Sequence, residues 1–141
     1  MESTTATAPL HRDVAQRWLV PGIAVFAATQ LLTALWMLVA PHSFFRNVGP
    51  FGVYNGHYLR DAMTMTAASG IALAASLHWR QLQAGALAVA TATFGLHAIN
   101  HWYAVDNAHA GSDAGIVDAV TLTIAFVLAV GLLRAAMRRS S

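Results

Sequence analysis

Residues 84–105, with the sequence AGALAVATATFGLHAINHWYAV, form the stretch that decides the fold. A helix of this length rises about 33 Å at ~1.5 Å per residue, which is close to the thickness of a bilayer core. Polar side chains gather toward its end, at Thr93, His97, Asn100 and His101. Their spacing of i, i+4, i+7 and i+8 places them on one helix face. Polar groups in an apolar span are costly and often mark functional sites.

The chain as a whole has the composition of a membrane protein. It is 57% hydrophobic and 10% charged, whereas soluble domains carry about 25% charged residues. Apolar stretches long enough to cross a bilayer occur at residues 18–40, 58–79, 84–105 and 116–137. We therefore expect an all-α integral membrane protein, a four-helix up-down bundle. Residues 1–16 are expected to form a disordered cytoplasmic tail, and residues 17–141 a single domain.

Composition also excludes several kinds of site. The chain has no cysteine, so a disulfide, a thiolate metal site and a cysteine nucleophile are ruled out. The formal net charge of +2 is small and scattered, so nucleic acid is not expected as a partner. The sequence has no C-x-x-C-H motif, so any haem would be bound non-covalently.

The basic residues, all of which are arginine, predict the orientation in the membrane. Cytoplasmic loops carry an excess of Lys and Arg. Six arginines lie before the first stretch, between the second and third, or at the end of the fourth, and these positions share one side of the membrane in an up-down bundle. The other two arginines lie on the opposite side. The six are Arg12, Arg17, Arg80, Arg134, Arg138 and Arg139, and the two are Arg46 and Arg60. We expect a multi-pass protein of the inner membrane with both termini in the cytoplasm.

Polar groups lie near the outer end of the other three stretches as well. They are Gln30 and Thr33, then His57, Arg60, Asp61 and Thr64, and finally Asp118 and Thr121. Within each stretch most of these residues share one helix face, because they are three, four or seven positions apart. The sequence therefore predicts a polar cavity inside the bundle that is open toward the outside.

Four polar residues, two on the second stretch and two on the third, have the side-chain chemistry of a metal site. His57 and Asp61, like His97 and His101, are spaced i, i+4, which lets two side chains reach one ion from the same helix. Three imidazoles and a carboxylate suit zinc, copper or iron. Two alternatives stay open. A haem could take one histidine from each of two helices. Alternatively, His97 or His101 could act as an acid or base, with Asp61 orienting it or tuning its pKa.

Other polar residues are candidates for ligand contacts or for structural roles. Arg60, Asn100 and Asp118 could contact a bound cofactor. Arg60 and Asp61 could instead pair and lock the bundle, and Asp118 could be favoured by the dipole of its helix. The threonines could hydrogen-bond between helices.

The connection at residues 41–56 is too apolar for a plain solvated loop. We expect a short interfacial segment there, which either anchors the protein at the membrane surface or covers the cavity. Small residues crowd the second and third stretches and permit close helix packing. That surface could serve a homo-oligomer or another membrane protein.

The sequence VYNGHYLRD at residues 53–61, followed by an apolar span, resembles the DoxX-like family of small four-helix bacterial membrane proteins. The histidines at the end of the third stretch resemble that family too. The resemblance covers roughly residues 18–137 and implies the four-helix fold. It points to His57, Arg60, Asp61, His97 and His101 as the positions that matter. Some members of the family act beside redox or thiol-handling partners.

Three hypotheses about function remain open. The first is a binding or redox-accessory protein that holds a metal, a haem or a small polar-headed lipid such as a quinone. The second is a membrane-embedded enzyme whose His–Asp pair performs acid–base chemistry on a lipophilic substrate. The third is a structural subunit of a membrane complex. A transporter is not favoured, because no broken helix or inverted repeat is visible.

Overall fold

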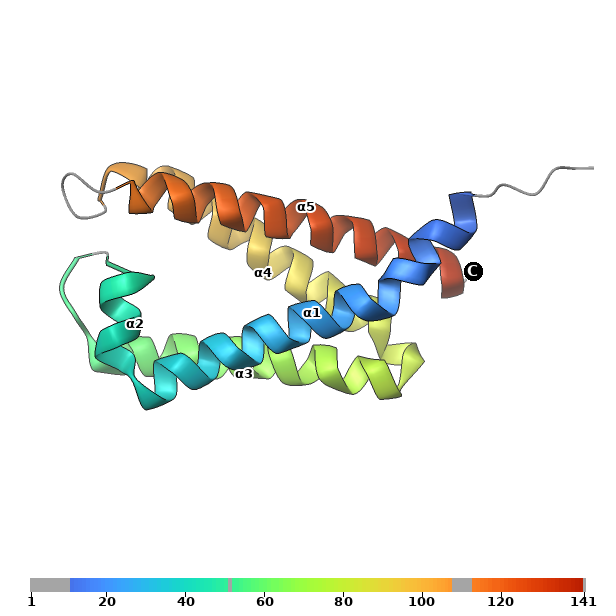
Figure 1. The fold of residues 1–141 in the computed structure, drawn as a ribbon, viewed down its shortest axis with the longest axis horizontal. Helices are drawn as coiled ribbons and strands as arrows, with labels where there is room; N and C mark the ends of the chain where they lie inside the picture. Colours follow the sequence, from blue (N-terminus) through green and yellow to red (C-terminus); the bar gives the residue numbers. More distant parts are fainter. Residues whose placement is uncertain (1–10, 51, 108–112, 141) are drawn as a thin grey trace, which may run out of the picture.

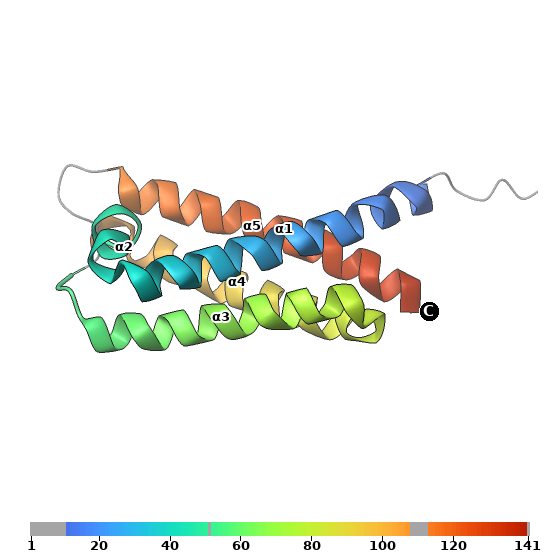
Figure 2. The same ribbon diagram turned by 60° about the horizontal axis from the view of Figure 1, so that its bottom comes forward.

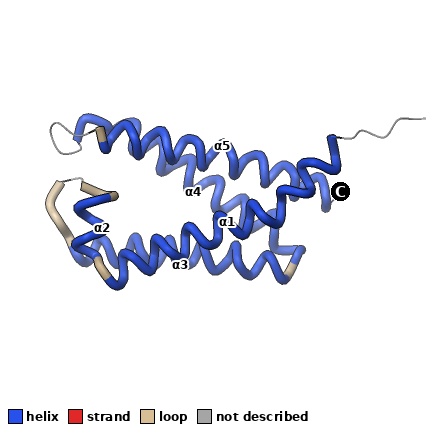
Figure 3. Tube along the Cα trace, viewed as in Figure 1, coloured by secondary structure: helices blue, strands red, loops and turns tan. Residues whose placement is uncertain are grey.

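A computed structural model describes residues 11–50, 52–107 and 113–140, and every regular element in them is a helix (Figures 1 and 3). The elements are α1 (His11–Val39), α2 (Pro41–Asn47), α3 (Gly56–His78), the 3-10 turn η1 (Arg80–Leu82), α4 (Gln83–Tyr103), the 3-10 turn η2 (Val105–Asn107) and α5 (Ala114–Ser140). The predicted all-α class is confirmed.

Three segments within these helices are long and apolar enough to span a membrane. They are Arg17–Val39, Arg80–Tyr103 and Gly115–Arg139, which match three of the four predicted spans. Helix α3 is not among them. It has 23 residues, but His57, Arg60 and Asp61 in its first two turns lower its hydropathy. The fourth membrane span, predicted at residues 58–79, is therefore not confirmed.

The first helix begins earlier than the sequence suggested. Its backbone is helical from His11, so residues 11–16 belong to α1 rather than to the expected tail. Residues 1–10 lie outside the described part of the chain. Helix α1 ends where Pro41 opens α2, because a proline disfavours the helical conformation in the residue before it.

The four long helices pack as two pairs, α1 with α3 and α4 with α5 (Figures 1 and 2). A glycine lies at the seam of each pair. A Cβ atom on Gly70 would lie 2.8 Å from Cγ of Leu31, and one on Gly95 would lie 2.9 Å from Cε2 of Phe126. Both distances are too short for a real Cβ, so glycine permits the close approach of each pair.

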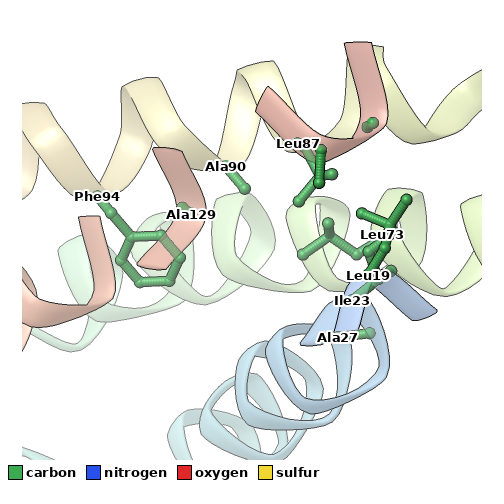
Figure 4. Close-up of a cluster of buried hydrophobic side chains, with 10 residues drawn as sticks. Leu19, Ile23, Ala27, Leu73, Leu87, Ala90, Phe94 and Ala129 are labelled. Atoms are coloured by element: carbon green, nitrogen blue, oxygen red, sulfur yellow. The ribbon is translucent and has the colours of Figure 1, made fainter. Parts of the chain in front are cut away.

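The core that joins the two pairs lies toward one end of the molecule, and Figure 4 shows its side chains. It combines the first halves of α1 and α4 with the second halves of α3 and α5. Its members are Leu19, Ile23, Ala27, Leu73, Leu87, Ala90, Phe94, Ala129, Ala135 and Ala136. Helix α1 begins and α5 ends at this end, and the two pairs diverge toward the other end (Figure 1). We call these the core end and the open end.

Helix α2 and the segment that follows it cover part of the open end. Phe44 of α2 is buried, with its ring edge-on to Trp36 at 5.7 Å between centroids. His42 stacks on Tyr54 with centroids 4.0 Å apart. Asn55 then caps α3, since its side-chain oxygen accepts hydrogen bonds from the backbone N–H groups of His57 and Tyr58 at 3.0 and 3.1 Å. The apolar segment predicted at residues 41–56 is therefore built around a short helix.

Candidate functional site

The polar face of α3 points away from the packed interior. His57 and Asp61 pair with each other, with 3.6 Å between Nε2 and Oδ2, and their side chains are 81% and 64% exposed. At ~100° per residue they lie about 160° and 120° around the helix from Leu73, which is fully buried. The sequence predicted that this face lines a cavity inside the bundle. The structure shows that it faces outward instead.

The polar face of α4 is arranged differently, because its two histidines contact each other. The Nε2 atoms of His97 and His101 are 3.1 Å apart, and the ring centroids are 4.7 Å apart. In the neutral state one Nε2–H group donates a hydrogen bond and the other Nε2 accepts it. His101 is half-buried, while His97 lies at the more exposed edge. One hydrogen bond thus links the two imidazole rings.

Asp118 of α5 lies near this pair on the neighbouring helix, without forming an ion pair with His97. Its carboxylate interacts electrostatically with His97. Its Oδ2 atom is buried and, among the described residues, accepts no hydrogen bond. Asp118 lies beyond the first turn of α5, where the helix dipole has little effect on a charge. We call His97, His101 and Asp118 the His–His–Asp cluster.

A hydrogen bond between the two helices fixes the position of this cluster. The indole Nε1–H of Trp102 donates to Oγ1 of Thr123 at 2.9 Å. Thr123 in turn donates to the backbone carbonyl of Ala119 at 2.7 Å. Trp102 directly follows His101 in the chain, and Ala119 directly follows Asp118. The bond therefore holds the register of α4 against α5 beside the cluster.

The predicted metal site is not supported by this arrangement. In the described ranges, no three His, Cys, Asp or Glu side chains lie close enough together to hold a metal ion. His57 and Asp61 form one group and His97 and His101 another, so the four do not converge. The cause lies in α3, whose small residues Ser69 and Gly70 pack inward and turn His57 and Asp61 outward.

The other predicted site residues are distributed as follows. Arg60 and Asn100 are exposed, Asp118 joins the cluster, and Gln30 is buried at the seam of α1 and α3. Thr33 is half-buried, and Thr93 and Thr121 are exposed. Thr64 donates to the backbone carbonyl of Asp61 at 2.7 Å rather than to another helix. None of these except Asp118 adds to the His–His–Asp cluster.

Two features of the structure were missed by reasoning from sequence. One is the Trp102–Thr123 bond, which hairpin symmetry does not reveal, because Trp102 lies in the last turn of α4 whereas Thr123 lies in the third turn of α5. The other is Gln83, which is 3% exposed and donates from Nε2 to the carbonyl of Ser76 at 3.3 Å. A glutamine beside a tight turn between two spans is the signal for such a bond.

The cluster has the groups needed for proton exchange. It holds two imidazoles that share one hydrogen bond, and a buried carboxylate oxygen that is free to accept another from a bound molecule. Axial ligation of haem between two helices needs a histidine from each. The contacting pair lies on one helix, so this geometry favours a smaller ligand over haem.

Comparisons of the chain with protein-family models, with curated proteins and with solved structures found no match. The resemblance to the DoxX-like family therefore rests on the residues that carry it, and it stays a prediction.

Proposed function

We propose that the chain is a four-span protein of the inner membrane with both termini in the cytoplasm. Helix α3 packs along α1, and its 23 residues give a length of about 34 Å, enough to cross a bilayer core. Its charged residues lie in the first two turns, where a span meets the membrane surface. The start of α1, the turn η1 and the end of α5 share the core end (Figure 1), and most arginines belong to these segments. The positive-inside rule then assigns the core end to the cytoplasm.

We propose further that the protein binds a small molecule with a polar head and an apolar body at the His–His–Asp cluster. One observation carries this proposal. The 3.1 Å contact between His97 and His101 lies beside a carboxylate whose buried oxygen accepts no hydrogen bond in the described structure. Buried polar groups are nearly always satisfied, and a catalytic role or an additional bound group is one explanation of an unpaired one.

The surroundings of the cluster suit a ligand that enters from the lipid. Exposed apolar side chains flank it on both helices, namely Leu96 and Ile99 on α4 and Val117 and Val120 on α5. Such residues would contact the hydrocarbon of the bilayer or of a ligand. A quinol, whose hydroxyl groups both donate and accept hydrogen bonds, would match the imidazoles and the carboxylate, and the corresponding quinone would accept from an imidazole N–H group.

The first experiment looks for the ligand itself. The full chain is purified in mild detergent, and small molecules that co-purify are extracted and identified by mass spectrometry. We expect the wild type to retain a quinone-class molecule and the double variant His97→Ala/His101→Ala to lose it. The matched control is His57→Ala/His78→Ala, which removes two exposed histidines outside the cluster and is expected to retain the ligand.

Two outcomes would contradict the proposal. Equal retention by the two double variants would show that the cluster does not bind the ligand. A wild type that retains no small molecule, and binds none when a short-chain quinone is titrated into it, would support the structural-subunit hypothesis instead. Turnover of a bound substrate that depends on Asp118 would support the hypothesis of an acid–base enzyme.

A second candidate function is binding of a transition metal by His97 and His101 alone. Two nitrogens bound to one zinc ion at ~2.0–2.1 Å in tetrahedral geometry lie about 3.3 Å apart, close to the 3.1 Å between the two Nε2 atoms. Zinc titration monitored by calorimetry tests this idea. Binding with one zinc per chain that the His97→Ala variant abolishes would support it, and zinc binding unchanged in that variant would contradict it.

A further inference from the structure

A pocket lies at the core end of the molecule, away from the His–His–Asp cluster at the open end. It has a volume of about 230 Å³ and is lined by Arg80, Gln81, Gln83, Ala136 and Arg139. Two elements supply the charge, because Arg80 begins η1 and Arg139 lies in the last turn of α5. A liquid water molecule occupies about 30 Å³, so the pocket has room for a group several times larger.

The charges of this pocket are not balanced within the described part of the protein. Its lining contains two arginines and, among the described residues, no carboxylate. The aspartates whose side chains are described lie toward the open end: Asp61, Asp106 and Asp118 belong to α3, η2 and α5, and Asp113 directly precedes α5. Two guanidinium groups at one small pocket repel each other unless an anion neutralises them, so the pocket favours an anionic ligand.

One wall of the pocket is also fixed in place. Gln83 is 3% exposed, and its side-chain nitrogen donates to the backbone carbonyl of Ser76 at 3.3 Å. Because an amide nitrogen carries two hydrogens, a second one is available for a ligand oxygen. The pocket thus combines two fork-shaped cations with an ordered amide, a combination that suits the oxygens of a phosphate.

The position of the pocket indicates where such a phosphate comes from. Arg80 is the first residue of the candidate span Arg80–Tyr103, and Arg139 is the last residue of the candidate span Gly115–Arg139. Both guanidinium groups therefore lie at the level where lipid head groups meet water. Basic pockets between helices on the cytoplasmic side are suited to anionic lipid head groups.

We infer that this pocket binds the phosphate of an anionic phospholipid from the cytoplasmic leaflet, with Arg80 and Arg139 as its cationic contacts. This goes beyond the proposed function, because it uses other residues at the other end of the molecule. It depends on the proposed membrane placement but not on any ligand of the His–His–Asp cluster.

The test titrates phosphatidylglycerol or phosphatidylcholine into the full chain in neutral detergent and follows bound lipid by native mass spectrometry. We expect phosphatidylglycerol to bind the wild type more tightly than phosphatidylcholine. Each charge-assisted hydrogen bond that is lost weakens binding about tenfold. The variant Arg80→Gln/Arg139→Gln should therefore bind phosphatidylglycerol about a hundredfold more weakly. The matched control Arg46→Gln/Arg60→Gln removes the same charge from exposed positions at the open end and should leave the affinity unchanged.

A conservative variant keeps the test decisive if the glutamine variant does not fold. Arg80→Lys/Arg139→Lys retains both charges but loses the fork geometry, so we expect a several-fold loss of affinity with a preserved preference for phosphatidylglycerol. Three results would overturn the inference: equal losses in the pocket and control variants, no preference of the wild type for phosphatidylglycerol, or saturation by inorganic phosphate with no retention of lipid.

Discussion

The polar faces of α3 and α4 make an instructive pair, because the same spacing has opposite outcomes. Each helix carries two titratable side chains at i, i+4 near the open end. On α3 these are His57 and Asp61, both largely exposed and 3.6 Å apart. On α4 they are His97 and His101, whose Nε2 atoms are 3.1 Å apart. His97 also interacts electrostatically with Asp118 of α5. The spacing sets which residues share a face, but it does not set where that face points.

Packing of small residues explains the difference. Gly70 on α3 meets Leu31 and Gln30 of α1, so the small-residue face of α3 packs inward and the charged face turns outward. On α4, Gly95 meets Phe126 of α5, and Trp102 bonds to Thr123. These two contacts bring α5, and with it Asp118, beside the histidines. Four changes would break or sharpen this comparison.

The largest effect is expected at the seam that orients α3. In Gly70→Ala the new Cβ would lie 2.8 Å from Cγ of Leu31, so the helices must separate, at a cost of about 1–3 kcal/mol in the free energy of unfolding. Denaturation in detergent micelles measures it. The control Gly131→Ala adds a Cβ with no atom within 4 Å and should not destabilise the protein. Equal stability of the two variants would mean that close packing does not orient α3.

The next effect concerns the bond that aligns α4 with α5. Trp102→Phe removes the donor of the 2.9 Å bond to Thr123, and we expect a loss of about 1 kcal/mol. The matched control is Trp36→Phe, because its indole donates to Ser43 at 3.4 Å, a length at which hydrogen bonds are weak. If both variants lose the same stability, the loss reflects the size of the side chain and not the Trp102 bond.

A gain in stability is expected at the cluster itself. A buried oxygen without a hydrogen bond costs about 1–3 kcal/mol, and the helix dipole offsets little of this cost, because Asp118 lies beyond the first turn of α5. Asp118→Ala should therefore stabilise the protein by about 1 kcal/mol or more while it abolishes ligand retention, the usual trade at a functional site. Asp61→Ala is the control and should change neither property. A destabilised Asp118→Ala variant would indicate that Asp118 holds the helices together.

Some of this arrangement was predictable from sequence, and some was not. Apolar length predicted α1, α4 and α5, since a hydrophobic run of that size is a one-dimensional property. The i, i+4 spacing predicted that His97 and His101 would lie together. The orientation of α3 was not predictable, because its small-residue face and its polar face could each have packed against the other helices. The partner of His97 was likewise hidden, because Asp118 reaches it only through the register that Trp102 and Thr123 set.

The smallest effect is expected on the exposed face of α3. His57 and Asp61 are spaced i, i+4 and highly exposed, so solvent screens their attraction and the pair contributes only about 0.3–0.5 kcal/mol. His57→Ala should leave stability nearly unchanged and ligand retention intact, in contrast to His97→Ala. A double-mutant cycle of His57→Ala with Asp61→Ala measures the coupling directly. A coupling well above 1 kcal/mol, or loss of the ligand in His57→Ala, would mean that the two polar faces act together and that α3 turns toward the cluster in the working protein.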